Sequence, residues 1–189
     1  VAVVFTLIGE FRNMLLFSAL LTGLLLLMRQ WRHAIFAGST LLFTALANTA
    51  TKYFFARVRP EVLSDPLTSY SMPSGHASGS FALFLTLAVL AGRGQPPRMR
   101  LTWLLVGCLP ALAISLSRVY LGAHWPTDVL AGAMLAACVC AASLWLIQRD
   151  TSLSALPPKV WWLVLPSLVA MFGFFVLRHL PHTMLRYAS

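Results

Sequence analysis

His124 and Asp128 are four residues apart, and a histidine and an aspartate at this spacing suit catalysis. Pro126 between them is typical of the first position of a helix, which places Asp128 in the first turn. At this spacing the carboxylate can reach back to one imidazole nitrogen, fix the tautomer and leave the other nitrogen free to attack. For an isolated pair a structural hydrogen bond is the commoner explanation, so the prediction of a nucleophile at His124 depends on its surroundings.

The tetrapeptide Pro73-Ser74-Gly75-His76 opens a long apolar stretch, residues 77–92. Pro and Ser are common at helix starts, and a capping sequence would explain those two residues alone. Gly75 adds a backbone that a ligand can approach closely, and the first amides of a helix point outward as an anion site. We therefore predict a phosphate cradle at Ser74 and Gly75, with His76 beside it.

Three basic residues, Lys52, Arg59 and Arg118, are the predicted partners of the phosphate. Lysine supplies a point charge, and arginine offers planar paired donors that match phosphate oxygens. Any one of them is explained equally well as a side chain that snorkels to the membrane interface. Three that converge beside an anion-binding helix start are hard to explain in that way. Arg57 falls outside this pattern, and we assign it to a lipid headgroup or to no role.

Taken together, these groups resemble the signature of the type 2 phosphatidic acid phosphatase superfamily, which includes lipid phosphate phosphatases and vanadium haloperoxidases. Its pattern is Lys, six residues, Arg-Pro; then Pro-Ser-Gly-His; then Ser-Arg, five residues, His, three residues, Asp. The sequence matches every position, in order and with every spacing correct. The resemblance covers residues 9–147, since Gly9-Glu10 also resembles the start of the span before the first motif.

The resemblance implies a catalytic role for three residues. His124 would attack phosphorus in line and form a phosphohistidine, and His76 would protonate the leaving group. Asp128 would hold His124 in place. The resemblance to the phosphatases of this superfamily implies a reaction without a metal or other cofactor, and the sequence offers no carboxylate cluster to bind a metal ion.

The resemblance also implies which groups bind the phosphate. The cations Lys52, Arg59 and Arg118 would contact its oxygens, helped by the amides of Ser74 and Gly75 and by the Ser74 hydroxyl. Cations in these positions stabilise the charge on the equatorial oxygens of the transition state. The expected partner is therefore a phosphorylated membrane lipid.

The composition is that of a membrane protein. Hydrophobic residues make up 59% of the chain and charged ones 10%, with a mean hydropathy of +0.79, whereas a soluble domain has about 25% charged residues. The net charge of +9 would suggest nucleic acid in a soluble protein, but here the basic residues sit singly between apolar stretches, so we expect no nucleic acid partner. Cys108, Cys138 and Cys140 lie inside apolar stretches and are interpreted as packing residues.

Six apolar stretches are candidate membrane spans, and each must be a helix because hydrocarbon offers no partner for unpaired backbone groups. We predict an all-α bundle of about six spans that forms a single membrane-embedded domain over residues 1–189. The catalytic core would occupy about 9–147, with an extra C-terminal span at about 160–177. Because the chain begins at Val1 and the first span of the usual arrangement is missing, we expect a processed form or a piece of a longer protein. The spans are Phe5–Met28, Ala34–Phe55, Ala77–Gly92, Leu101–Leu116, Val129–Ile147 and Val160–Leu177.

Six crossings place the loops on alternating sides, with the three motifs together on one side. Each side carries seven Lys and Arg, but without Lys52, Arg59 and Arg118 the count is seven against four. By the positive-inside rule the side without the motifs is cytoplasmic. We therefore expect a multi-pass protein of the cell inner membrane with its site on the extracytoplasmic side.

Two other functions stay open at this stage: a non-hydrolytic lipid-phosphate binder or transporter, and a vanadium haloperoxidase, although those relatives are soluble. The loop Glu61–Met72 is predicted to cover the pocket. Nothing in it separates undecaprenyl pyrophosphate or phosphatidylglycerol phosphate, our preferred substrates, from phosphatidate. The oligomeric state is not predicted. The six tryptophans, with His33, His179 and His182, are interpreted as interfacial residues without a ligand role.

Overall fold

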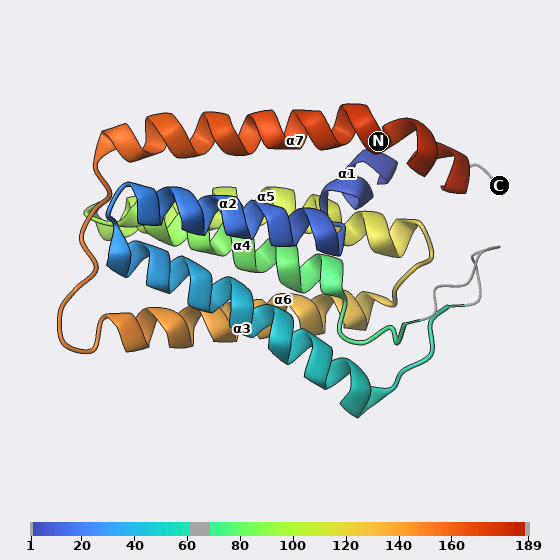
Figure 1. Cartoon of the computed structure of the whole chain (residues 1–189). Coiled ribbons are helices and arrows are strands. Elements are labelled where there is room, and N and C mark those ends of the chain that lie inside the picture. The colour runs from blue at the N-terminus through green and yellow to red at the C-terminus, as the bar shows by residue number, and fades with distance from the viewer. Residues whose placement is uncertain (1, 61–68, 188–189) are drawn as a thin grey trace.

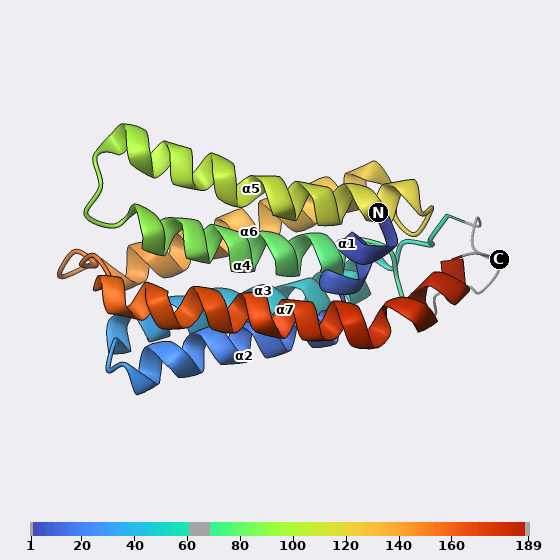
Figure 2. The same cartoon turned by 90° about the horizontal axis from the view of Figure 1, so that it is seen from above.

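The computed structural model describes residues 2–60 and 69–187, and these residues form seven α-helices and no strand. The predicted all-α fold is therefore confirmed for the described part of the chain. Figures 1 and 2 show that the long helices run roughly parallel to one another, with the fourth helix, α4, in the middle. The helices are α1 (Ala2–Ile8), α2 (Phe11–Leu27), α3 (Trp31–Phe55), α4 (Gly75–Gly92), α5 (Pro97–Tyr120), α6 (Pro126–Ile147) and α7 (Pro158–Tyr187).

Five of these helices are long and apolar enough to cross a membrane: α3, α4, α5, α6 and α7 over Pro158–His179. The shorter apolar stretch Arg12–Leu27 of α2 runs beside them. Only 11% of the apolar window of α7 is buried inside the protein, against 56% for α4. Outward-facing apolar side chains of this kind suit contact with lipid, so the chain is a multi-pass membrane protein.

The first predicted span, Phe5–Met28, is not one continuous helix. α1 ends at Ile8 and α2 begins at Phe11, with Gly9 and Glu10 between them. The Asn13 side chain donates to the Leu7 carbonyl at 2.7 Å. This hydrogen bond satisfies one of the backbone carbonyls that have no helical partner at the C-terminal end of α1. Helix propensity alone does not reveal this break, because it depends on the surface against which α1 packs.

The central helix α4 packs against α2, α3, α5 and α6 through small residues. A Cβ added at Gly132 of α6 would lie 2.7 Å from the Ser74 carbonyl oxygen, and one added at Gly107 of α5 would lie 2.9 Å from the Phe84 carbonyl oxygen. Helices that lack a hydrophobic driving force in lipid associate through such close backbone approach. Gly132 therefore sets the distance between α6 and the start of α4.

The motif residues gather at one end of the bundle. α3 and α5 end there, and α4 and α6 begin there, at the right of Figure 1. The connections with most of the non-motif basic residues lie at the opposite end. The predicted alternation of loops between two sides is therefore observed.

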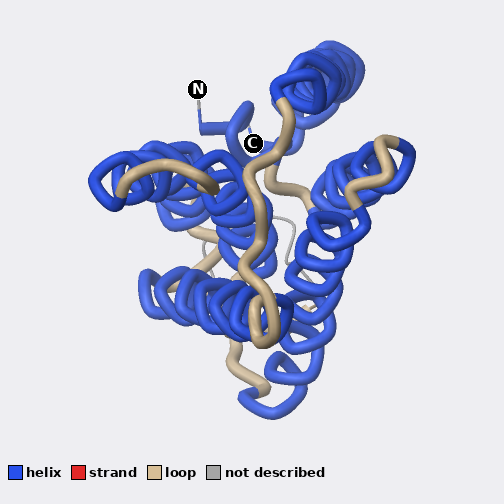
Figure 3. The backbone as a smooth tube through the Cα atoms, turned by 90° about the vertical axis from the view of Figure 1, so that its left-hand side faces the viewer, coloured by secondary structure: helices blue, strands red, loops and turns tan. Residues whose placement is uncertain are grey.

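A connection at the opposite end, residues 148–157, crosses the bundle between α6 and α7 (Figure 3). Arg32 donates to the carbonyls of Ile147 and Thr151, and His33 Nε2 lies 2.9 Å from the Ser154 carbonyl oxygen. Leu153, within this connection, is buried. The sequence interpretation of His33 as an interfacial residue did not include this contact: the residue is 3% exposed and helps to hold the connection.

The close approach at Gly132 predicts a position-specific loss of stability. Gly132→Ala forces the Ser74 backbone away and should cost about 1–3 kcal/mol, which lowers the midpoint of thermal unfolding in detergent. Gly23→Ala is the matched control, since a Cβ there meets nothing within 4 Å and should stabilise α2 by about 0.5–1 kcal/mol. Equal midpoints for the two variants would contradict the packing described for α6 and α4.

Candidate functional site

The three motif segments meet at a single site, as predicted. Lys52 lies in the last turn of α3, Ser74 is the N-cap of α4, and Arg118 lies in the last turn of α5. His124 lies in the turn between α5 and α6, and Asp128 is in the first turn of α6. The electrostatic neighbours shared within this group are Lys52, Arg59, His76, Arg118 and His124.

His124 and Asp128 face one another in a buried environment. The His124 Nδ1 atom lies 3.5 Å from Asp128 Oδ2, beyond ordinary hydrogen-bond length, and no closer partner of Nδ1 exists in the described part of the chain. The side chain of Asp128 is completely buried. Its Oδ2 atom also accepts a hydrogen bond from the Trp125 backbone N–H at 3.0 Å, the usual way in which an acidic residue in the first turn caps a helix.

The other nitrogen of His124 identifies the tautomer. Arg59 Nη1 lies 3.0 Å from His124 Nε2. A guanidinium carries only donors, so Nε2 must accept through its lone pair. The ring proton is therefore on Nδ1, on the side of Asp128. This is the tautomer that a histidine nucleophile needs, with the lone pair on Nε2.

The environment of His124 favours the neutral ring. Burial lowers its pKa to about 4, because the charged form is desolvated; Asp128 opposes this shift, while Arg59, Arg118 and Lys52 add to it. At neutral pH the imidazole is therefore uncharged. A free lone pair is thus available on Nε2 without any prior proton transfer.

The start of α4 differs in one respect from the predicted cradle. The Ser74 hydroxyl accepts from the Ala77 N–H at 3.4 Å, so Ser74 is the N-cap. Its own N–H donates to the Asp128 carbonyl at 2.9 Å. The prediction that the Ser74 amide binds phosphate was therefore wrong. This N–H is already used in a hydrogen bond that holds α4 against α6. The hydroxyl proton and the amide of Gly75 remain as the candidate donors.

The cations contact the chain that precedes α4. Lys52 Nζ donates to the Tyr70 carbonyl at 2.7 Å, and Arg59 donates to the carbonyls of Ser69 and Ala123 at 2.7 and 2.8 Å. Arg118 is 3% exposed. Of the loop predicted to cover the pocket, residues 61–68 lie outside the described residues, and residues 69–72 run beside these cations.

Gly9 lies against His76 in a way that motif reasoning did not predict. A Cβ added at Gly9 would lie 3.0 Å from His76 Cδ2 and would overlap the side chain of Ile114. The turn between α1 and α2 therefore covers one side of His76. The polar pair Gly9-Glu10 inside an apolar stretch is the sequence signal that could have indicated this turn.

Arg57 has a partner, contrary to the sequence prediction. Its Nη1 atom lies 2.9 Å from Asp128 Oδ1 and 2.6 Å from Thr127 Oγ1, and its guanidinium lies 5.5 Å from the centre of the Trp125 ring. Trp125 thus belongs to the site as well as to the interface. Side chains two residues apart in an extended segment point the same way. Because Arg59 was predicted to face the site, the same direction could have been predicted for Arg57.

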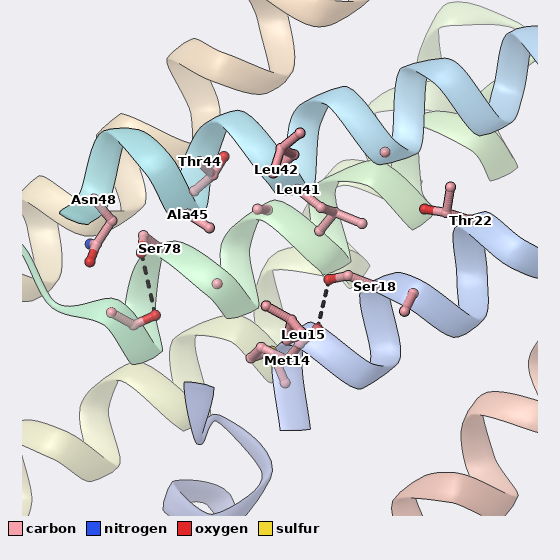
Figure 4. A pocket seen from close by; sticks show the side chains of 15 residues that line it. Met14, Leu15, Ser18, Thr22, Leu41, Leu42, Thr44, Ala45, Asn48 and Ser78 are labelled. Carbon is pink, nitrogen blue, oxygen red and sulfur yellow. Dashed lines mark hydrogen bonds between the residues drawn. The ribbon is translucent and has the colours of Figure 1, made fainter. Parts of the chain in front are cut away.

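An apolar cavity of about 390 Å³ lies between α2, α3 and α4 and ends at the start of α4. Figure 4 shows Asn48 of α3 and Ser78 of α4 at that end, with Met14 and Ser18 of α2 further along. Leu15 and Leu42, which are more than half exposed, also line it. The cavity therefore connects Gly75 with the outer surface of the bundle.

Potential metal ligands do not cluster here. Within residues 2–60 and 69–187, no group of three or more His, Cys, Asp or Glu side chains is close enough to hold an ion. The charged groups of the site are chiefly cations, which suits an anionic ligand.

Comparison with known proteins identifies the class. The family model of the PAP2 superfamily matches residues 32–152. The chain therefore belongs to the PAP2 superfamily, as its motifs indicated.

Individual relatives match over shorter stretches. The chain is 36% identical over 129 residues to the undecaprenyl-diphosphatase of Sulfolobus acidocaldarius, covering 60% of this chain and 55% of that protein. It is 33% identical over 93 residues to phosphatidylglycerophosphatase B of Bacillus subtilis, covering 46% and 44%. The chain thus spans about half the length of these curated relatives.

A solved structure shares the fold. The crystal structure of a transmembrane PAP2-type phosphatidylglycerolphosphate phosphatase from Bacillus subtilis superposes with a TM-score of 0.66 at 23% identity. The match covers 78% of this chain and 75% of that one. The arrangement of helices around the site is therefore that of a known membrane fold.

The neutral state of His124 can be observed directly by NMR with ¹⁵N-labelled histidine. We expect a ring with its proton on Nδ1 that stays neutral from pH 8 to 5 and takes up a proton only as the pH falls toward about 4. His124→Gln assigns the signal by its loss. Titration near the usual value of about 6.5, or a proton on Nε2, would contradict the described environment.

Proposed function

We propose that the protein is a membrane phosphatase that hydrolyses a lipid phosphate or pyrophosphate through a phosphohistidine at His124. One observation carries this proposal: a neutral imidazole whose lone pair on Nε2 faces Arg59, among the cations Lys52 and Arg118. A group that only binds phosphate needs the cations but not an oriented lone pair. The completed histidine–aspartate arrangement therefore favours hydrolysis over binding or transport.

The proposed first step is in-line attack by His124 Nε2 on phosphorus. A P–N bond forms as the P–O bond to the leaving group breaks. His76, protonated once the anionic phosphate offsets the surrounding cations, gives its proton to the departing oxygen. The ring then carries a positive charge because both nitrogens are substituted. The nearby Asp128 carboxylate, 3.5 Å from Nδ1, balances that charge.

The second step returns the enzyme to its starting state. Water attacks the phosphohistidine on the face left by the lipid and gives its proton to neutral His76. The P–N bond breaks, inorganic phosphate leaves, and His124 recovers its lone pair. His76 is protonated again for the next cycle, so the two steps balance.

The cations would replace the metal ions used by many other phosphatases. Arg59 lies at the attacking nitrogen itself, so its guanidinium must move only from Nε2 to a phosphate oxygen when the substrate enters. Lys52, Arg118 and the α4 start provide further donors for the equatorial oxygens. We accordingly propose a metal-independent reaction without a cofactor.

The lipid chain would occupy the apolar cavity between α2, α3 and α4, because that cavity ends at Gly75 beside the phosphate donors. The relatives named above act on undecaprenyl diphosphate or are named for phosphatidylglycerophosphate. These two lipids are our preferred substrates, with phosphatidate as a third candidate.

The proposed orientation follows from the distribution of charge over the two ends. Seven basic residues lie in the connections at the end opposite the site or in the first helical turns beside them: Arg29, Arg32, Arg93, Arg98, Arg100, Arg149 and Lys159. The positive-inside rule assigns that end to the cytoplasm. The site would then open at the extracytoplasmic face of the inner membrane.

The proposed chemistry predicts phosphate release without metal. Purified protein in detergent with EDTA should release inorganic phosphate from at least one of the three candidate lipids, measured side by side. His124→Ala should lose turnover entirely while its unfolding midpoint stays near that of the parent, because only the nucleophile is removed. An active His124→Ala protein, or binding of all three lipids without release, would contradict the proposal.

The role of the cavity predicts a dependence on chain length. Ala45 lines the cavity, so Ala45→Phe should raise KM for a long-chain lipid phosphate and leave hydrolysis of a dihexanoyl analogue unchanged. Leu46→Phe is the matched control, since the neighbouring Leu46 is 56% exposed and does not line the cavity. If Ala45→Phe affects both substrates equally, the lipid chain binds elsewhere.

A further inference from the structure

Arg57 links the segment after α3 to the first turn of α6. Its Nη1 atom donates to Asp128 Oδ1 at 2.9 Å and to Thr127 Oγ1 at 2.6 Å. The guanidinium also lies 5.5 Å from the centre of the Trp125 ring, within the range of a cation–π interaction. All three partners closely follow His124, at the N-cap and in the first turn of α6.

The two carboxylate oxygens of Asp128 have different partners. Oδ1 accepts from Arg57, whereas Oδ2 accepts from the Trp125 N–H at 3.0 Å and faces His124 Nδ1 at 3.5 Å. A carboxylate held by donors at both oxygens cannot rotate about its terminal bond without losing one of them. Arg57 therefore fixes the plane in which Oδ2 meets the imidazole.

The charge of Asp128 also requires a partner. Its side chain is completely buried, and a buried carboxylate without a counter-charge is costly. Arg57, 37% exposed at its side chain, supplies that charge from the edge of the site. Among the groups around Asp128, it is the cation that makes direct ion-pair contact with the carboxylate.

We propose that Arg57 is a positioning residue for the phosphatase reaction, which acts through Asp128 on His124 without touching the substrate. This inference rests on the proposed function, since it assumes that His124 attacks phosphorus. A fixed Asp128 holds Nδ1–H in place before attack and stays close when the phosphorylated ring becomes cationic. Loss of Arg57 would remove the ion-pair partner of Oδ1 and leave the carboxylate held less firmly, by the Trp125 N–H and the Ser71 side chain.

The test separates the catalytic rate from substrate binding. Arg57→Leu should lower kcat by roughly 10- to 100-fold, the range found for outer partners that orient a functional histidine, and leave KM unchanged. Arg57→Lys should recover part of the rate, because an ammonium can still pair with Oδ1. Thr127→Val is the control, since it removes the other contact of the same Arg57 nitrogen and should keep the parental kcat.

A double variant tests whether the effect passes through Asp128. In an Asp128→Asn background, Arg57→Leu should cause no further loss in a single-turnover assay, because the group it positions is already altered. A rise in KM with unchanged kcat would instead show that Arg57 contacts the lipid headgroup. Equal losses in both backgrounds would show that it acts independently of Asp128. Either result overturns the proposal.

A second readout does not depend on turnover. In ¹⁵N-histidine spectra of the full chain, Arg57→Leu should shift the His124 ring signals and mix the two tautomers, while Thr127→Val leaves them unchanged. An unaltered His124 spectrum in a folded Arg57→Leu protein overturns the positioning role. If the parent protein releases no phosphate, the proposed function fails, and these spectra still decide the contact between Arg57, Asp128 and His124.

Discussion

Asp128 is the residue on which the rest of the site depends, because it contacts each of the three motif segments. Its Oδ1 atom pairs with Arg57 after α3, its backbone carbonyl accepts from Ser74 at the start of α4, and its Oδ2 atom faces His124. These contacts join segments that are 54 and 71 residues apart. The carboxylate thus adds a buried ion pair to the backbone contact between α4 and α6 and to the contact of Arg57 with Thr127.

A polar junction of this kind is demanding at the edge of a membrane. Every buried donor and acceptor there needs a partner, because lipid offers none. The chain meets much of this requirement with caps and small residues: Ser74 caps α4, Asp128 accepts from the Trp125 N–H, and Gly132 lets α6 lie against the α4 backbone. With Arg59 at Nε2, these contacts favour one tautomer of His124 before a ligand binds, which is the preorganisation that the proposed phosphoryl transfer requires.

The sequence was sufficient to predict the helical class, because apolar length is a local property. The meeting of the motif residues was predicted from the resemblance to a known family, whose signature the chain matches. Four features were missed, and each depends on packing between distant segments, although the Gly9-Glu10 pair and the spacing of Arg57 from Arg59 left a signal in the sequence. They are the break at Gly9-Glu10, the pairing of Arg57 with Asp128, the use of the Ser74 amide, and the contact of His33 with Ser154. The identity of the lipid is not encoded in any of these contacts.

The most direct test of the account is a search for the covalent intermediate. Protein mixed with substrate and quenched in base within milliseconds, where a phosphorus–nitrogen bond survives, can be digested and analysed by mass spectrometry. The account predicts one phosphate on His124, bonded to Nε2, that appears before free phosphate and decays as it is released. Steady turnover with no phosphorylated residue, or with phosphate on a residue other than His124, would contradict it.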